Sequence, residues 1–298
     1  MDKIAVLFLA AGYGSRLQRD INNDASGRFS HLKGVAKALL PLDGVPLISH
    51  WQRLLTSSSA ADVDSFVICN EANYPQFKEW ASSNSFPVEN IFNDGSTANE
   101  TRLGAVTDLA LAIQKFDLAR LDVSSGRAVY KAVLVIAGDT LFLKDFSLDA
   151  FLKLALSAKP IGKEPCFVTS YPVENEMDTL KTGIIETTDQ DLFKFDTITV
   201  PRVTGLVEKP HPTETTSRLA CPCFYFLSHP SLGLVKAFVD ASLERGEGLE
   251  SRDASGRFIS ALVKQHPVYA VPVSGRLDIG GLSSFISAEE YLQQAKKA

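Results

Sequence analysis

Residues 4–17 read Ile-Ala-Val-Leu-Phe-Leu-Ala-Ala-Gly-Tyr-Gly-Ser-Arg-Leu, and this stretch decides the fold. Its first half is a continuous apolar run, which is typical of a strand that is buried on both faces of a parallel sheet. The run opens into Gly12 and Gly14, where bare backbone N–H groups can surround phosphate oxygens. Arg16, and Lys37 after a polar loop, add the positive charge that a di- or triphosphate requires. The segment therefore predicts a nucleotide site and an activity on its phosphates.

Two common nucleotide motifs do not fit this loop. A dinucleotide-binding fingerprint needs a third glycine where this chain has Leu17, and Arg16 stands beside that position. No Gly-Lys-Ser/Thr sequence closes the loop, as a P-loop requires. The arginine instead favours direct contact with phosphate charge.

Composition narrows the class of protein. The 298 residues are 45% hydrophobic and 22% charged, a composition that is ordinary for a soluble protein. The net charge of −5 provides no broad basic surface, so we expect no nucleic-acid partner. The four cysteines match neither a zinc site nor a disulfide framework, and Cys221-Pro222-Cys223 reads as two small buried hydrophobes. The N-terminal apolar run lacks a convincing signal cleavage site, and no later run has membrane-spanning length. We expect a cytoplasmic protein without a membrane partner.

Strand and helix patterns alternate as far as about residue 150 and then change. In the first half, strands are expected at Ile4–Leu9, Ser65–Cys69, Val88–Phe92 and Val133–Ala137, and helices at Leu47–Thr56, Gln76–Ser82 and Thr101–Phe116. After about Phe151, strand-like pieces dominate, at Cys166–Tyr171, Gly183–Thr187, Leu192–Phe195, Val203–Glu208 and Ala220–Leu227. Helices return near Leu232–Leu243, Phe258–Lys264 and Ser284–Ala295, with a strand at Val268–Pro272.

This pattern predicts an α/β fold. We expect a Rossmann-like three-layer α/β/α arrangement with a mixed, mostly parallel sheet and a small antiparallel lobe. No change of composition marks a linker, so residues 1–298 are expected to form a single domain with halves 1–150 and 151–298.

The hexapeptide Asp-Ala-Ser-Gly-Arg-Phe occurs twice, at residues 24–29 and 253–258. The flanks differ and no longer repeat surrounds either copy, so the chain is not a repeat protein. The simpler interpretation is a turn-forming sequence that enters a helix or an ordered loop. A shared ligand or subunit contact is the alternative.

Five motifs together resemble one family. Leu9–Leu17, Lys37–Leu47, Gly138-Asp139, Glu208-Lys209-Pro210 and Asp278-Ile279-Gly280 look like the motifs of the nucleotidyltransferases that make nucleotide-diphosphate sugars. They occur in the family's order over residues 4 to about 292. The resemblance implies an enzyme that joins a nucleoside triphosphate (NTP) to a sugar 1-phosphate with Mg²⁺, and it implies an oligomer. The nucleotide would bind in the first half, and the sugar in the second half with its antiparallel lobe.

The resemblance also implies a role for each matching position. Arg16, Lys37 and Asp139 would be catalytic, and Asp139 and Asp278 would bind Mg²⁺. Gly183, Glu208 and Lys209 would bind the sugar phosphate. The nucleotide would contact Leu9, Ala10, Ala11, Gly12, Gly14, Ser15, Arg16, Gly95 and Arg102.

The chemistry of the expected reaction requires residues of these types. The attacking oxygen of a sugar 1-phosphate is already charged at neutral pH, so the reaction needs no general base. It needs in-line placement of two anions and neutralisation of the departing pyrophosphate. Cationic side chains and a hard cation held by one or two carboxylates supply both.

Three departures from the family's pattern leave the acceptor open. Ala36 stands where the family usually has proline, and the Gln18–Val35 loop is longer than usual. Ala220-Cys221-Pro222-Cys223 replaces the usual Asn-x-Gly of the sugar site. Because related cytidylyltransferases carry an arginine around Arg102, a CTP-dependent enzyme acting on phosphocholine or a phosphonate is the alternative. A third interpretation is a non-catalytic regulatory subunit that binds nucleotide sugars.

Overall fold

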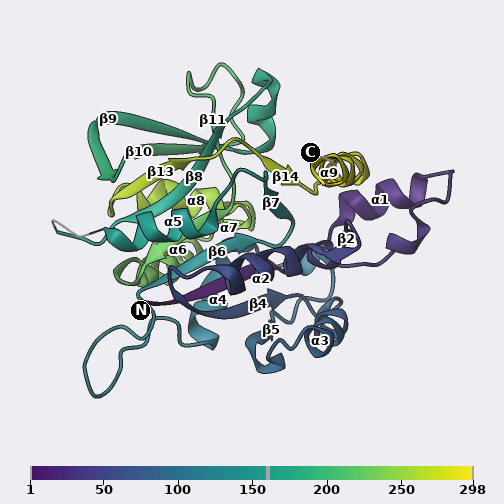
Figure 1. Ribbon diagram of the computed structural model, residues 1–298, viewed down its shortest axis with the longest axis horizontal. Helices are drawn as coiled ribbons and strands as arrows, with labels where there is room; N and C mark the ends of the chain where they lie inside the picture. The colour runs from purple at the N-terminus through teal and green to yellow at the C-terminus, as the bar shows by residue number, and fades with distance from the viewer. Residues whose placement is uncertain (1, 159–161, 297–298) are drawn as a thin grey trace.

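The computed structural model describes residues 2–158 and 162–296 and is built on one mixed sheet of ten strands (Figure 1). The strands follow the chain as β1 (Lys3–Ala10), β4 (Asp62–Cys69), β5 (Ile91–Asn93), β6 (Ala132–Ala137), β8 (Cys166–Pro172), β9 (Gly183–Phe195), β10 (Ile198–Glu208), β11 (Leu219–Cys221), β12 (Phe224–Ser228) and β13 (Val268–Pro272). Their order in the sheet is β11-β9-β10-β13-β8-β12-β6-β1-β4-β5.

The sheet is parallel from β6 to β5 and antiparallel in the lobe. Strands β6, β1, β4 and β5 pair in parallel, as do β8 and β13. Strand β12 lies antiparallel between these two blocks, and β9, β10 and β11 form the small antiparallel lobe. The expected mixed α/β fold is therefore confirmed.

Two hydrophobic cores lie on opposite faces of the sheet. In β1, Ile4, Val6 and Phe8 join one core, whereas Ala5 and Leu7 join the other, because side chains alternate along a strand. Helices α1 (Ser15–Asn23), α2 (Leu47–Ser57), α3 (Tyr74–Ser83), α5 (Leu148–Ser157) and α9 (Leu282–Ala295) cover the first core. Helices α4 (Ala105–Lys115), α6 (Leu232–Glu244) and α8 (Ser255–Leu262) cover the second, which gives three layers.

Short elements connect these layers. Two small antiparallel sheets pair β2 (Pro41–Leu42) with β3 (Val45–Pro46), and β7 (Thr140–Phe142) with β14 (Arg276–Asp278). One turn of α-helix, α7 (Glu250–Asp253), precedes α8. Turns of 3₁₀ helix occur at η1 (Ser30–Leu32), η2 (Lys37–Leu39), η3 (Val88–Asn90), η4 (Asn99–Thr101), η5 (Glu176–Lys181) and η6 (His229–Ser231).

Several boundaries in the first half differ from expectation for identifiable reasons. The expected loop Gln18–Val35 begins inside helix α1, which the sequence hides because it buries only Leu17 and Ile21. The helix expected from Thr101 starts at Ala105, because Gly104 before it has a φ of +92°. The first residues of the strand expected at Val88–Phe92 form η3 instead.

The second half departs from expectation in three places. Helix α5 lies where mainly strands were expected to begin. The two strands expected within residues 183–195 are one long strand, β9. The strand expected at Ala220–Leu227 is interrupted at Pro222, whose nitrogen carries no hydrogen for a sheet bond.

The two copies of the hexapeptide adopt different structures. In the first copy, Ser26 donates from its backbone N and its Oγ to Asp24, and the segment is an exposed turn. In the second, Asp253 ends α7 and Ser255 begins α8. This agrees with the simpler interpretation, because local turn chemistry accommodates both settings.

Candidate active site

The turn after β1 and the turn after β6 meet at one edge of the sheet. Gly138 donates its N–H to the carbonyl of Leu9 over 2.9 Å, which fixes the next residue, Asp139, beside the glycine turn. Lys37 places its Nζ 3.2 Å from Asp139 Oδ2. Gly14 adopts a φ of +61°, and a methyl group on it would lie 3.2 Å from Cγ of Lys37. The lysine, the carboxylate and the glycine turn therefore form one compact group.

A second carboxylate reaches the same place from the end of the chain. In the β7–β14 pair, Asp278 lies opposite Thr140, and Ile279 donates its N–H to the carbonyl of Asp139 over 3.0 Å. The side chain of Asp278 is 46% exposed, and partial desolvation together with the negative charge of Asp139 raises its pKa, while Arg276 and other cations oppose the shift. Arg276 lies 3.4 Å from Asp278 and Lys37 lies 3.2 Å from Asp139, so each aspartate has a cation beside it.

This donor set suits a hard divalent cation. Mg²⁺ is commonly held by one or two carboxylates and keeps waters or substrate phosphates in its other positions. The charge repulsion felt by Asp278 is the kind that a bound cation would relieve. Within residues 2–158 and 162–296, no group of three or more His, Cys, Asp or Glu converges on a metal site, so the protein supplies at most this pair there.

Arg16 approaches the aspartates from helix α1. A methyl group on Gly280 would lie 3.5 Å from Nη1 of Arg16 and 3.4 Å from Oδ2 of Asp278. Asp20, one turn along the same helix, accepts a hydrogen bond of 3.3 Å from the N–H of Leu282. Helices α1 and α9 lie beside each other (Figure 1), so the C-terminal segment positions the arginine of the first loop.

A cavity of about 350 Å³ extends from the β1 turn to the lobe. Its wall contains seven predicted site residues: Leu9, Ala11, Gly12, Arg102, Gly183, Glu208 and Lys209. It also contains residues that were not predicted, among them Asp108, Lys181, Cys223, Tyr225, Asp253, Ser255, Gly256 and Arg276. Burial raises the pKa of the Cys223 thiol to about 11, so this cysteine is a neutral part of the wall.

At one end of the cavity, the two halves of the chain are joined by an ion pair. Arg102 donates from Nε and Nη2 to the two carboxylate oxygens of Asp253, over 3.1 and 2.9 Å. The aspartate belongs to the second hexapeptide, 151 residues further along. Arg102, which was expected to contact the nucleotide, thus lines the cavity, but its charge is already engaged by Asp253.

At the other end, two glycines make room for an acidic side chain. A methyl group on Gly183 would lie 3.2 Å from Oε2 of Glu208, and one on Gly256 would overlap the same oxygen. Burial raises the pKa of Glu208, although Lys209 and Arg257 oppose the shift. Glu208 therefore lies in a partly desolvated wall, where a hydrogen bond that it accepts would be stronger than in water.

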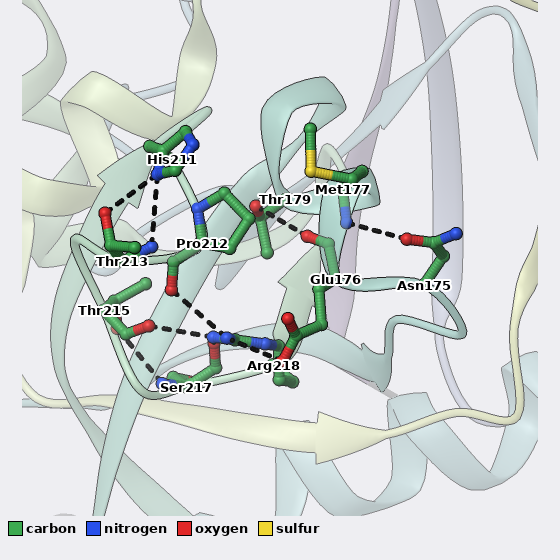
Figure 2. A network of polar contacts seen from close by, with 10 residues as sticks. All are labelled: Asn175, Glu176, Met177, Thr179, His211, Pro212, Thr213, Thr215, Ser217 and Arg218. Atoms are coloured by element: carbon green, nitrogen blue, oxygen red, sulfur yellow. Dashed lines mark hydrogen bonds and ion pairs between the residues drawn. The ribbon is translucent and has the colours of Figure 1, made fainter.

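Arg218 connects the segments that carry Lys181 and Lys209, at the Glu208 end of the cavity, by hydrogen bonds and an ion pair (Figure 2). Its guanidinium donates to the carbonyls of Thr215, Ser217 and Pro212 in the loop after Lys209, over 2.8 to 3.2 Å. It also lies 3.3 Å from Oε1 of Glu176 in η5, the turn that ends at Lys181. One half-buried guanidinium thus anchors the two segments that carry Lys181 and Lys209.

The structure separates the predicted residues into groups. It gathers Gly14, Arg16, Lys37, Asp139 and Asp278 at the carboxylate pair, with Ala10 ending β1 and Ser15 beginning α1. Gly95 lies in the turn after β5, outside the cavity wall, where its N–H is bonded to Asn93. The second hexapeptide and Arg276 next to Asp278 were signals in the sequence that could have identified further wall residues.

The parallel edge, the glycine turn and the two aspartates with their neighbouring cations are features that suit the binding of nucleotide phosphates. Residues 5–295 match the family described as "Nucleotidyl transferase", and the chain belongs to this family. The expected nucleotidyltransferase family and its enzymatic class are therefore confirmed. No curated protein matches the sequence.

Solved structures share the fold at low sequence identity. An apo UDP-glucose pyrophosphorylase has a TM-score of 0.66 at 16% identity, covering 99% of this chain and 100% of its own. A putative glucose-1-phosphate thymidylyltransferase from Bacillus anthracis scores 0.63 at 16%, covering 97% and 94%. A CTP:phosphocholine cytidylyltransferase from Streptococcus pneumoniae scores 0.59 at 17%, covering 98% and 100%. Across the described part of the chain, no helix is both long and apolar enough to cross a bilayer.

Proposed function

We propose that this protein transfers a nucleotidyl group from an NTP to a sugar 1-phosphate and releases pyrophosphate. The observation that carries the proposal is the contact of 3.2 Å between Lys37 and Asp139, beside Asp278, at the edge of a cavity lined by Glu208 and Lys209. The triphosphate would lie on the glycine turn. The sugar phosphate would lie on the lobe side, where lysines neutralise it and Glu208 accepts bonds from sugar hydroxyls.

The residues act by placement and by charge. Lys209 and Lys181 hold the acceptor phosphate so that one of its oxygens faces the α-phosphorus of the triphosphate. That oxygen forms the new P–O bond as the bond to pyrophosphate breaks, and no proton moves. Arg16 and Lys37 stabilise the charge that moves to the leaving pyrophosphate. Asp139 and Asp278 are the residues that would hold Mg²⁺, which when bound supplies further charge neutralisation.

The second candidate changes the acceptor and the base. The structural likeness to a CTP:phosphocholine cytidylyltransferase motivates it. The cavity wall favours a sugar, because Lys181, Lys209 and Arg276 would repel a quaternary ammonium. An aromatic face would be needed to attract that group, but Tyr225 in the wall is only 1% exposed.

A pyrophosphate-release matrix tests both candidates. UTP, dTTP, CTP, GTP and ATP are each combined with common sugar 1-phosphates, with phosphocholine and with 2-aminoethylphosphonate, all with Mg²⁺. We expect release with one NTP and a sugar 1-phosphate. Release only with CTP and a choline or phosphonate acceptor would favour the second candidate. Tight binding of a nucleotide sugar without turnover of any pair would overturn both in favour of a regulatory protein.

The carboxylate assignment has its own test. Asp139→Asn should lower kcat at saturating Mg²⁺ and substrates by about a hundredfold or more, the scale seen when one charge-stabilising group is lost. The control is Asp189→Asn, which makes the same change at an exposed position on β9. Full turnover of Asp139→Asn would show that this carboxylate has no part in the reaction.

A further inference from the structure

One arginine in the cavity wall also contacts the carboxylate pair. Arg276 on β14 belongs to the wall of the cavity, and its Nη1 lies 3.4 Å from Oδ1 of Asp278. Asp278 in turn is fixed near Asp139, because the next residue, Ile279, donates its N–H to the carbonyl of Asp139 over 3.0 Å. The guanidinium of Arg276 therefore lies at the junction between the cavity and the two aspartates.

Partners from both halves of the chain hold this guanidinium. Tyr171, which pairs with Ala220 of the lobe strand β11, accepts a hydrogen bond of 3.1 Å from Nε. Thr140 on β7 accepts one of 3.4 Å from Nη1, and its own carbonyl accepts a bond of 2.7 Å from the buried indole of Trp51. The side chain of Arg276 is only 14% exposed. The surrounding fold thus sets the position of the guanidinium before any substrate binds.

These contacts leave part of the guanidinium free for a ligand. Each is a single bond or ion pair of 3.1 to 3.4 Å, unlike the two-bond fork that Arg102 makes with Asp253. Among the described residues, Nη2 of Arg276 has no hydrogen-bond acceptor, and this atom is open to solvent. A guanidinium keeps its charge at neutral pH and has five N–H donors in one plane. The N–H groups of Nη2 therefore remain for an anion.

The position of Arg276 indicates which phosphate it can bind. The triphosphate is assigned to the glycine turn and the aspartates, and the acceptor to the Glu208 end of the cavity, so the phosphorus under attack lies between them. We propose that Arg276 is a catalytic residue whose Nη2 donates to a non-bridging oxygen of the α-phosphate and stabilises the transition state. This inference rests on the proposed function, because it takes the cavity to be the place where the two substrates meet.

The reaction gives this cation a task that is not assigned to Arg16 or Lys37. An acceptor oxygen forms a bond to the α-phosphorus while the bond to pyrophosphate breaks, and no proton moves. In the transition state, negative charge is spread over the equatorial oxygens of the transferred group. Arg16 and Lys37 are assigned to the departing pyrophosphate, which leaves those oxygens to another donor. A guanidinium that is already in position can stabilise them without a cost for reorganisation.

The kinetics of Arg276→Ala test the assignment. We expect kcat to fall about a thousandfold, the scale for an arginine that stabilises a phosphoryl transition state, while the KM of each substrate changes less than about fivefold. Guanidinium chloride, kept well below the concentration that unfolds the protein, should restore part of the turnover, and sodium chloride at the same ionic strength should not. The matched control is Arg202→Ala, because Arg202 is also partly buried and ion-paired, to Asp191 over 3.0 Å, but lies outside the cavity wall. This control should turn over like the wild type.

Two further variants separate catalysis from support of the fold. Arg276→Lys keeps the charge but not the planar fork, so it should still lose at least about tenfold in kcat, and it keeps the test valid if the alanine variant folds poorly. Tyr171→Phe removes the acceptor of Nε and should lower kcat about tenfold by misplacing the guanidinium. Because Tyr171 acts through Arg276, Tyr171→Phe should cost nothing further in the Arg276→Ala background.

Two results would overturn the inference. One is a wild-type kcat in folded Arg276→Ala or Arg276→Lys. The other is a loss in Arg276→Ala that guanidinium does not restore and that Tyr171→Phe increases by its full factor, because both side chains would then only support the fold.

Phosphorus NMR separates this inference from the proposed function. An α,β-methylene analogue of the NTP that binds most tightly is added to the wild type and to Arg276→Ala. The shift of its α-phosphorus resonance on binding should be smaller in the variant, and the shift of the γ-phosphorus should be the same. This difference, without pyrophosphate release from any substrate pair, would defeat the proposed transfer alone. Pyrophosphate release by the wild type, with equal α-phosphorus shifts in the two proteins, would defeat this inference alone.

Discussion

Replacing Gly104 with alanine should strongly destabilise this protein, and the structure gives the size of the effect. Gly104 has φ +92° and ψ 146°, a region open essentially to glycine, so a side chain costs on the order of 1–3 kcal/mol in strain. The added methyl would also lie 2.8 Å from the carbonyl oxygen of Arg252 and 3.0 Å from Cα of Asp253. Both atoms are backbone, so relief requires a shift of α7, at about 1–3 kcal/mol more. The expected loss is therefore about 2–6 kcal/mol.

Urea unfolding followed by circular dichroism measures this loss. The matched control is Gly126→Ala, because Gly126 is exposed, has φ +67° and has no atom within 4 Å of the added methyl. The control should lose about 1–2 kcal/mol, the ordinary cost of a left-handed alanine. Because α7 carries Asp253, Gly104→Ala should also weaken nucleotide binding, which the control should preserve. Equal losses of stability in the two variants would refute the reasoning, since the backbone contact would then contribute nothing.

Two further predictions concern Arg218 and Asp108. Arg218→Ala should raise the KM for the sugar phosphate roughly five- to tenfold with a smaller change in kcat, because the loops that carry Lys181 and Lys209 lose their common anchor. Initial-rate kinetics would measure this, with the exposed Arg127→Ala as the control. An unchanged KM in Arg218→Ala would contradict the prediction. Burial, followed by the negative charges of Asp94 and Asp253, raises the pKa of Asp108 to about 8, so in the native state Asp108 keeps a proton that the unfolded chain releases above about pH 4. Wild-type stability should therefore fall relative to Asp108→Asn as the pH rises from about 4 to about 8 and then level off. Urea unfolding at pH 5, 7 and 9 checks the sign, and parallel curves for the two proteins would show that Asp108 ionises freely in the native state.

The sequence predicted the parts of the site that are local. The apolar run of β1 and the glycines after it identify a strand and a turn without any knowledge of distant residues. Asp139 follows another apolar strand, and because parallel strands end at the same edge, its closeness to the turn follows from topology. Asp278 was expected there through family resemblance, and its register opposite Thr140 places it there.

The parts that were missed depend on long-range packing. The pairing of Arg102 with Asp253 joins residues 151 apart, and neither has a local pattern that names the other. The buried Asp108 in the cavity wall is similar, because a buried aspartate in a helix looks like an exposed one when read from sequence. Helix α1 was hidden for a different reason, since it is only nine residues long, is mostly polar and buries only Leu17 and Ile21.

The order of strands in the sheet has a consequence for the synthesis of this chain. Strand β6 lies between β1 and β12, but β12 begins only at Phe224, long after β6 has left the ribosome. Until then, β6 is an open edge of backbone groups flanked by the apolar side chains of Val133–Ile136, which is a template for wrong pairing with other chains. Pairing with β12 therefore closes this edge only after the second half of the chain has been synthesised.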